Sequence, residues 1–154
     1  MKLSTVEQQV RREIGFRLFT VLAWLPGRQV LHRAHSNLPE QYPVGGEKSS
    51  ADVSAEWLDR CIRGQEPFFG PDPASVREVF ADHSLIAELG CGSVINVPVV
   101  AEDGTVLGAL AVLDAEQAYR PADVQRAAKL ATAAVPALAE LVQRLDNTQE
   151  EPKP

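Results

Sequence analysis

A short stretch of the chain, FADHSLIAELGCGSVINVPVV over residues 80–100, brings together four side chains that could do chemistry. Asp82, His83 and Cys91 all belong to residue types that bind metal ions. A cysteine near a histidine is also the pairing that activates a thiol nucleophile. Asn96 places an amide inside an apolar run, which is typical of a polar contact in a binding pocket. The stretch is therefore compatible with a metal site, a reactive thiol or the wall of a pocket.

The spacing of these residues does not favour a metal site. Zinc needs three or four ligands at converging positions, and the only other histidines, His32 and His35, lie far earlier in the chain. No pair of candidate ligands shows a recurrent metal-binding spacing, so we expect neither a metal nor another cofactor. His83 is then expected to cap a helix, to form a hydrogen bond in the core or to make a polar contact in a pocket.

Cys91 lies between two glycines just before an apolar run. Free cysteine is among the most buried residue types, so its simplest role is that of a small buried apolar group. A reactive role requires a pKa lowered by a nearby base, and His83 is the candidate base. A redox pair with Cys61 would require a close approach of the two Cα atoms, which the sequence does not establish. We expect Cys91 to line a pocket, with thiol catalysis as the alternative.

Asn96 is the leading candidate for a ligand contact. An amide in the middle of an apolar strand must find hydrogen-bond partners or lower the stability of the fold. Either neighbouring loop backbone supplies those partners, or a polar group of a ligand does. Tyr42, Trp57 and Phe80 are candidate aromatic walls of the same pocket, although aromatic side chains on apolar faces also form ordinary core.

Length, composition and charge indicate one acidic globular domain. The chain has 154 residues, of which 45% are hydrophobic and 23% charged, and its net charge is -6. An acidic chain without a basic stripe is not expected to bind nucleic acid. The apolar run LFTVLAWL at residues 18–25 is too short to span a membrane. We expect a cytoplasmic protein with a single domain over residues 1–145 and a disordered tail over residues 146–154.

Hydrophobic periodicity and turn residues predict a mixture of helices and strands. Ser75 and Glu78 have the spacing of a capping box, and Asp82 is the expected cap of a further short helix that Gly90 ends. The other predicted elements are a helix over 4–14, strands over 17–25 and 30–36, an irregular loop over 36–50, a helix over 52–63, a short strand over 67–70, a hairpin over 93–114 and a last helix over 121–145 that Pro136 should kink.

The predicted hairpin has two different faces. Asp103-Gly104 suits a two-residue turn, which sets the predicted pairs Ala101–Val106, Val99–Gly108 and Asn96–Ala111. One face then carries only branched apolar side chains, namely Ile95, Val97, Val99, Leu110 and Val112. The other face sets Asn96 and Pro98 opposite Ala111 and Ala109, with Val94, Val100, Leu107 and Leu113 around them. We expect the branched face to pack on helices and the roomier Asn96 face to border a cavity.

Residues 93–131 resemble the C-terminal half of a GAF domain. The resemblance rests on Ser93, the strand end Val97-Pro98-Val99, the run VLGALAVLD, Tyr119 and the helix start at Pro121. It implies an α+β fold with an antiparallel sheet of five or six strands. The N- and C-terminal helices would cover one face, and short helices and loops would enclose a ligand pocket on the other. The family also commonly dimerises through its terminal helices.

Several motifs of specialised GAF domains are missing from this sequence. The chain lacks the Asn-Lys-x-x-x-Phe-x-x-x-Asp-Glu signature of cyclic-nucleotide binders, and Cys91 has no adjacent histidine of the kind that marks bilin attachment. The resemblance therefore implies a homodimeric sensor of an unknown small polar ligand, without an output domain of its own and acting on an output protein partner. The alternatives are a dimerisation module without a ligand and a thiol-dependent reductase related to free methionine sulfoxide reductase, although that enzyme uses three cysteines.

Overall fold

The computed structural model describes residues 2–150, and the side chains of residues 2–145. Six strands form one antiparallel sheet in the order β3-β2-β1-β6-β5-β4. In chain order the strands are β1 Leu18–Leu25, β2 Val30–Ser36, β3 Glu47–Ser49, β4 Phe68–Gly70, β5 Ser93–Val100 and β6 Val106–Asp114. This architecture confirms the predicted α+β fold with an antiparallel sheet.

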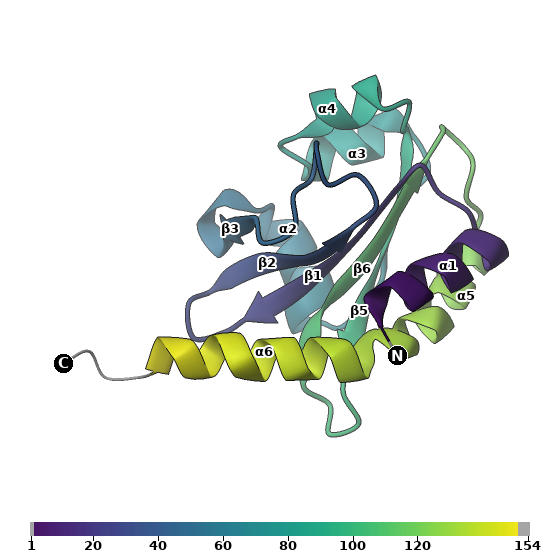
Figure 1. Ribbon diagram of the computed structural model, residues 1–154. Helices are drawn as coiled ribbons and strands as arrows, with labels where there is room; N and C mark the ends of the chain where they lie inside the picture. Colours follow the sequence, from purple (N-terminus) through teal and green to yellow (C-terminus); the bar gives the residue numbers. More distant parts are fainter. Residues whose placement is uncertain (1, 151–154) are drawn as a thin grey trace.

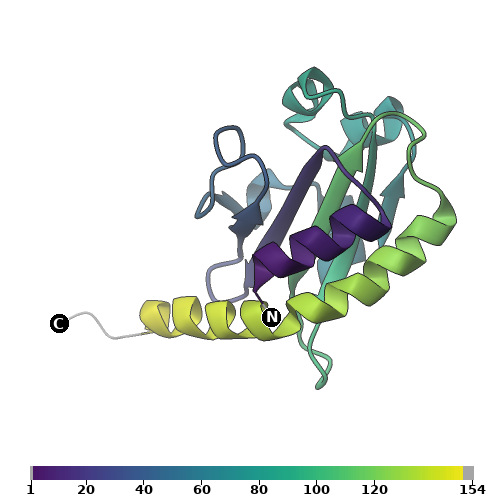
Figure 2. The same cartoon turned by 45° about the vertical axis from the view of Figure 1, so that its right-hand side comes forward.

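Three helices cover one face of the sheet (Figures 1 and 2). They are α1 Leu3–Glu13, α5 Pro121–Ala131 and α6 Val135–Glu150. Val6 and Val10 of α1 and Leu138 of α6 are fully buried against the sheet. The sheet contributes to this core the side chains of Phe19, Val21, Ile95, Val97, Val99, Leu110 and Val112. The expectation that the terminal helices share one face is therefore confirmed.

Short elements cover the opposite face of the sheet (Figure 1). They are α2 Ala55–Trp57, which continues as a π-helical segment over Leu58–Arg63, and then α3 Pro73–Val79 and α4 His83–Glu88. We call these helices, together with the loop over residues 37–46, the cap. A second core lies beneath the cap and contains, among others, Leu18, Trp24, Trp57, Cys61, Ile62, Val76, Ile86, Val94, Ala109 and Ala111.

The middle of the β5–β6 hairpin has the predicted register. Asn96 pairs with Ala111, and Val99 pairs with Gly108. The branched face packs on the helices, whereas Val94, Ala109, Ala111 and Leu113 belong to the core beneath the cap. The predicted difference between the two faces is therefore confirmed in this part of the hairpin.

The end of the hairpin differs from the prediction. The Gly104 N–H donates to the Ala101 carbonyl at 2.9 Å, and Gly104 adopts a φ of +90°, so the turn is not the expected two-residue one. A bulge near the end of β5 pairs Val100 with Val106, and the predicted pair of Ala101 with Val106 is wrong. Because a bulge inserts an extra residue, Leu107 moves to the helix-covered core instead of the cap face.

The predicted last helix is interrupted near Pro136, as expected, but it is divided into two helices and not only bent. A 3-10 turn over Thr132–Ala134 separates α5 from α6. Proline has no N–H, and its ring clashes with the carbonyl four residues earlier, which here belongs to Thr132. Helix α6 then continues to Glu150. The backbone of residues 146–150, predicted to be disordered, is therefore helical, and the rest of the predicted tail, 151–154, lies outside the described residues.

Strand β3 lies inside the segment that the sequence predicts to be irregular. It pairs with β2 through Glu47, Lys48 and Ser49. The Glu47 carboxylate also accepts hydrogen bonds from Arg28 at 2.9 and 3.0 Å and lies 2.8 Å from the His32 ring. These contacts come from residues outside the segment, so the local abundance of glycine, proline and serine could not reveal the strand.

The starts of two cap helices also differ from the prediction. The helix predicted from residue 52 begins at Ala55, because the Ser54 hydroxyl accepts a bond from the Trp57 N–H. Helix α3 begins at Pro73, since the Asp72 carboxylate accepts the Ser75 N–H at 2.9 Å. Ser75 is therefore inside the helix, and the predicted capping box at this position is wrong.

Candidate functional site

A hollow between the sheet and the cap holds four of the six predicted pocket residues. Its empty volume is about 450 Å³, including its open mouth. Asn96, Tyr42, Trp57 and Phe80 line it. The other lining residues are Leu18, Thr20, Leu22, Arg33, Lys48, Asp82, Ile86, Ala111 and Leu113. We call this space the cap hollow; it lies on the sheet face that the sequence predicts to border a cavity.

Asn96 lies on the floor of the cap hollow, in the middle of β5. Its backbone pairs with Phe68 of β4 and Ala111 of β6, and the residue is only 2% exposed. Among the described residues, its Oδ1 atom has no hydrogen-bond partner. Burying an unpaired polar atom costs about 1–3 kcal/mol. Neighbouring loop backbone does not satisfy this oxygen, so it can accept a hydrogen bond from a bound molecule.

Two further residues that line the cap hollow also carry a buried polar atom without a partner. The Trp57 Nε1 and Arg33 Nε atoms are both hydrogen-bond donors, and neither has an acceptor in the described part of the chain. Across residues 2–145 only one other such atom occurs, Nε of Arg28, which lies outside the hollow and is paired with Glu47 through its other nitrogens. Buried polar atoms nearly always have partners, so three lining residues that each carry an unpartnered atom mark the cap hollow as a candidate binding site.

Arg33 reaches from β2 towards the cap. Its Nη1 atom donates to the Pro43 carbonyl at 3.1 Å, and the guanidinium carbon lies 5.1 Å from the centre of the Tyr42 ring. Burial lowers the pKa of Arg33, against smaller opposing effects of Tyr42 and Asp82. The described residues supply no carboxylate within ion-pair distance of this guanidinium. It is therefore a partly desolvated cation that an anionic ligand could neutralise.

Asp82 joins the loop over 37–46 to helix α4. It stands at the predicted N-cap of α4, but its side chain makes no capping bond. Its carboxylate instead accepts the Tyr42 hydroxyl at 2.5 Å and lies 3.8 Å from Lys48 Nζ. Burial, and then the bond to Asp82, raises the pKa of Tyr42 well above its usual range, so the phenol stays protonated and donates. The Asp82 carboxylate thus already interacts with Tyr42 and Lys48.

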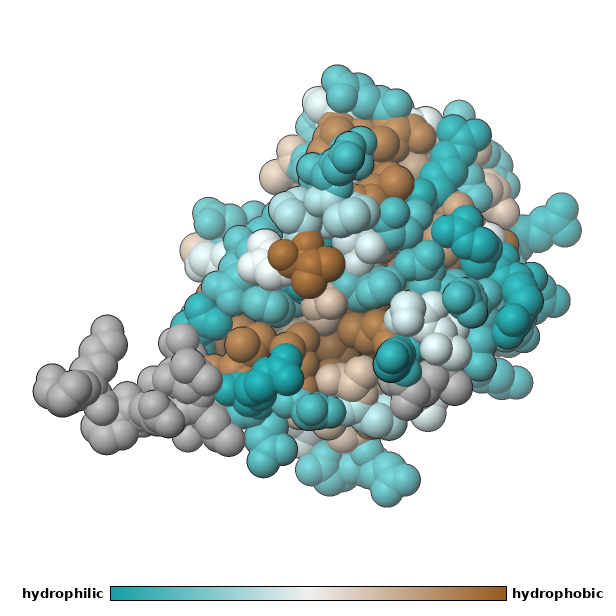
Figure 3. Space-filling view, viewed as in Figure 1, coloured by the Kyte–Doolittle hydropathy of each residue, from teal (hydrophilic) through white to brown (hydrophobic). Residues whose placement is uncertain are grey.

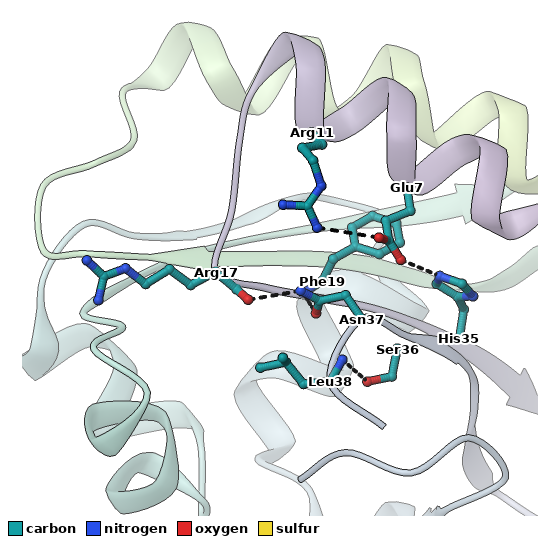
Figure 4. Close-up of polar contacts among 8 residues, drawn as sticks. All are labelled: Glu7, Arg11, Arg17, Phe19, His35, Ser36, Asn37 and Leu38. Carbon is teal, nitrogen blue, oxygen red and sulfur yellow. Dashed lines mark hydrogen bonds and ion pairs between the residues drawn. The ribbon is translucent and has the colours of Figure 1, made fainter. Parts of the chain in front are cut away.

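The loop that carries Tyr42 is fixed at its base by Asn37 (Figure 4). The Asn37 Oδ1 atom accepts the Phe19 N–H at 2.6 Å, and its Nδ2 atom donates to the Arg17 carbonyl at 3.0 Å. At the other end of the loop, the backbone of Arg33 bonds to both glycines of residues 45–46. Both ends of the loop are therefore held by the sheet, and Tyr42 lies between them.

Apolar side chains form the rest of the wall. Leu18 and Leu22 come from β1, Ile86 from α4 and Ala111 from β6, where the small alanine is paired beside Asn96. A neighbouring hollow of about 400 Å³ shares the side chains of Leu22, Lys48, Trp57, Phe80 and Asp82 with the cap hollow. A few placed polar groups on mainly apolar walls are typical of small-molecule sites.

The two remaining predicted site residues lie elsewhere. Cys91 and His83 line a separate hollow between α3, α4 and the start of β5. Burial, and then the charge of Asp114, raises the pKa of Cys91 to about 11, although Arg17 opposes this effect. The thiol is therefore protonated near neutral pH, whereas a nucleophilic cysteine requires a lowered pKa. The structure thus divides the six candidates between two places and does not favour the thiol-dependent alternative.

Both cysteines should react slowly with iodoacetamide in the folded protein at neutral pH. Burial raises the pKa of Cys61 to about 12 and contributes most to that of Cys91. The two-unit rise at Cys91 leaves about 100-fold less thiolate, so labelling of Cys91 should be about 100-fold slower than in concentrated guanidinium chloride, and labelling of Cys61, whose pKa is raised further, should be slower still. Mass spectrometry of time points at rising pH measures this rate. Rapid labelling of native Cys91 at neutral pH would contradict the prediction and support thiol catalysis.

Two kinds of feature do not occur in the described part of the chain. Across residues 2–145, no three His, Cys, Asp or Glu side chains are grouped so that they could hold a metal ion. Among the described helices, none is both long and apolar enough to cross a lipid bilayer.

Sequence reasoning missed Arg33 and Lys48 as residues of the cap hollow. Arg33 lies on β2 two positions after Leu31 and so points to the same face. Leu31 is buried beneath the cap, so an arginine at the next inward position was the available signal. Lys48 lies on β3, which the sequence does not predict, and no comparable signal marks it.

Solved structures share this fold at low sequence identity. The GAF domain of a two-component sensor histidine kinase from Bacillus halodurans is 14% identical, with a TM-score of 0.70 over 93% of this chain and 94% of that one. A GAF domain/HD domain protein from Geobacter sulfurreducens is also 14% identical, with a TM-score of 0.70 over 90% and 91% of the two chains. A far-red cyanobacteriochrome photoreceptor is 17% identical, with a TM-score of 0.62 over 90% and 85%.

These likenesses establish the fold, which occurs in photoreceptors and sensor kinases. No curated protein sequence matches this chain. The family model described as "GAF domain" matches residues 3–139, and this range includes all six strands. The expectation drawn from the Val-Pro-Val hairpin is therefore confirmed, and the chain belongs to the GAF domain family.

Proposed function

We propose that this GAF domain is a sensory module that binds a small polar molecule in the cap hollow. The observation that carries the proposal is the cluster of buried polar atoms without protein partners on Asn96, Arg33 and Trp57. A molecule that bonded to these atoms would offset the free-energy cost of burying them.

Ligand binding would change the cap. Arg33 and Tyr42 both line the cap hollow, and both also hold the loop over residues 37–46 through contacts with Pro43 and Asp82. A ligand that engages Arg33 would therefore alter the contacts that position this loop. Such a shift requires the ligand to bind one arrangement of the loop more tightly than another.

The proposal also includes a homodimer and a partner that reads the state of the cap. Figure 3 shows hydrophobic side chains gathered along α6. Val135, Ala139, Leu141 and Val142 of this helix are only partly buried against the core. A symmetric dimer would cover them with the same surface of a second copy. The terminal helices would then connect the two cap hollows through the shared core.

Native mass spectrometry of the purified protein tests both parts of the proposal. We expect twice the chain mass plus a discrete adduct that is lost on denaturation. The Asn96→Leu variant should fold and dimerise but lose the adduct, because leucine cannot accept a hydrogen bond. The adduct mass would then identify the ligand and allow its effect on the melting temperature to be measured.

Ser93→Ala is the matched control for this experiment. Ser93 lies on the same strand and is fully buried, but its hydroxyl donates to the Ala115 carbonyl at 2.7 Å and does not line the cap hollow. This variant should lose stability and keep the adduct. A bare dimer whose melting temperature responds to no member of a metabolite library would overturn ligand binding and support a pure dimerisation module.

A further inference from the structure

We infer that the ligand of the cap hollow is a small monocarboxylate that also carries a hydroxyl or N–H donor. The inference rests on the proposed function, because it concerns the same site. It follows from three properties of the hollow: its net charge, the two donors without partners, and the single acceptor without a partner.

The charges that line the cap hollow favour one negative charge on the ligand. Arg33 and Lys48 contribute two positive charges and Asp82 one negative charge, which leaves one positive charge. Asp82 lies 3.8 Å from Lys48, so the unpaired charge is that of Arg33. Asp52 is exposed and lines the neighbouring hollow but not the cap hollow. A dianion would place its second charge near Asp82 with no cation to pair it, and buried unpaired charge is costly.

The orphan donors match the two oxygens of a carboxylate. The Arg33 Nη1 atom already bonds to the Pro43 carbonyl, while Arg33 Nε remains available. Trp57 Nε1 is the second donor and belongs to a residue that is 2% exposed. Arginine binds carboxylates through charge-assisted hydrogen bonds, and an indole N–H can only donate. One carboxylate could therefore accept from both donors.

The orphan acceptor requires a second polar group on the ligand. Asn96 Oδ1 can be satisfied only by a donor, and a carboxylate has none at neutral pH. The ligand must therefore carry an O–H or N–H group apart from its carboxylate, as in a hydroxy acid or an N-acyl amino acid. The rest of its surface would contact the apolar walls formed by Leu18, Leu22 and Ile86.

The Trp57 indole provides a direct measurement. The chain has two tryptophans, and Trp24, the other one, does not line the cap hollow. A proton–nitrogen NMR spectrum therefore contains two indole N–H signals, which the Trp24→Phe variant assigns. Titration with lactate should shift the Trp57 signal and leave that of Trp24 unchanged. Propionate, which lacks the hydroxyl, and lactamide, which lacks the charge, should each bind about 10-fold more weakly.

Variants test separately the contact of Arg33 with the carboxylate and the contact of Asn96 with the hydroxyl. Arg33→Gln should weaken lactate binding by about 10-fold or more, and Arg33→Lys, which keeps the charge but not the Nε donor, should fall between Arg33→Gln and the wild type. Arg28→Gln is the matched control, because Arg28 also has a buried Nε without a partner but lies outside the hollow. Asn96→Leu should bind lactate as weakly as propionate, because it removes the oxygen that would accept a hydrogen bond from the lactate hydroxyl.

The outcomes distinguish this inference from the proposed function. If lactamide or inorganic phosphate shifts the Trp57 signal at lower concentration than lactate does, the hollow binds ligands but the monocarboxylate assignment is wrong. If no carboxylate shifts it, or if Arg28→Gln weakens binding as much as Arg33→Gln does, the assignment is also wrong. In each case native mass spectrometry still tests the proposed function, because it measures the adduct and the loss of that adduct in Asn96→Leu.

Discussion

Replacing Gly108 with alanine should lower the free energy of unfolding by more than about 3 kcal/mol. Gly108 pairs with Ala23 of β1 and Val99 of β5 in the centre of the sheet. A Cβ atom at this position would lie 1.8 Å from the Leu22 carbonyl oxygen. The clash is with backbone, so β1 and β6 would have to separate. Urea unfolding followed by circular dichroism measures the loss.

Gly104→Ala is the control for this substitution. Both glycines have a positive φ, of +154° at Gly108 and +90° at Gly104, but a Cβ atom at Gly104 would meet nothing within 4 Å. Gly104→Ala should cost only about 1–2 kcal/mol, the strain of a left-handed residue. If the two substitutions proved equally costly, backbone conformation alone would explain both effects, and close strand packing at Gly108 would be the wrong explanation.

Replacing Asn37 with alanine should lower the free energy of unfolding by about 1–3 kcal/mol. Beyond the pair of Thr20 with Ser36, the Asn37 N–H donates to the Phe19 carbonyl at 3.0 Å. The Asn37 side chain adds bonds to the Phe19 N–H and the Arg17 carbonyl (Figure 4). The substitution would leave the Phe19 N–H without an acceptor. Urea unfolding measures the loss, and hydrogen exchange at the Phe19 amide should become faster.

Ser36→Ala provides the comparison at the same loop base. It removes a single bond, in which the Leu38 N–H donates to the Ser36 hydroxyl at 3.1 Å, and should cost about 0.5–1.5 kcal/mol. Exchange at Phe19 should not change. A loss in Asn37→Ala no larger than in Ser36→Ala, with normal protection of Phe19, would show that Asn37 does not hold the loop.

The parts of the fold that sequence predicted well depend on local patterns. The alternation of branched and small residues along β5 and β6 fixed which face packs on helices. Proline chemistry correctly indicated the start of α5 at Pro121 and the interruption at Pro136. The turn was missed because Asp103-Gly104 also suits a longer loop, and the displacement of Leu107 depends on a bulge that no local pattern marks.

The candidate site was predicted less completely than the fold. Asn96 was identified because an amide in an apolar strand requires an explanation, and the structure places three of the predicted aromatic residues in the same hollow. Arg33, whose charge the ligand inference uses, was missed because arginine is usually exposed, although its place two positions after Leu31 puts it on the cap face. Cys91 and His83 were grouped with Asn96 by closeness in sequence, but they line a different hollow.

The two edges of the sheet have a consequence for how this protein can aggregate. Its outermost strands, β3 and β4, have three residues each. Strand β3 presents the charged residues Glu47 and Lys48, and β4 is flanked by Pro67 and Pro71, which have no N–H to donate. Short, charged or proline-flanked edges give a second chain little backbone to pair with. Concentrated solutions of the native protein should therefore resist growth into fibres by strand addition.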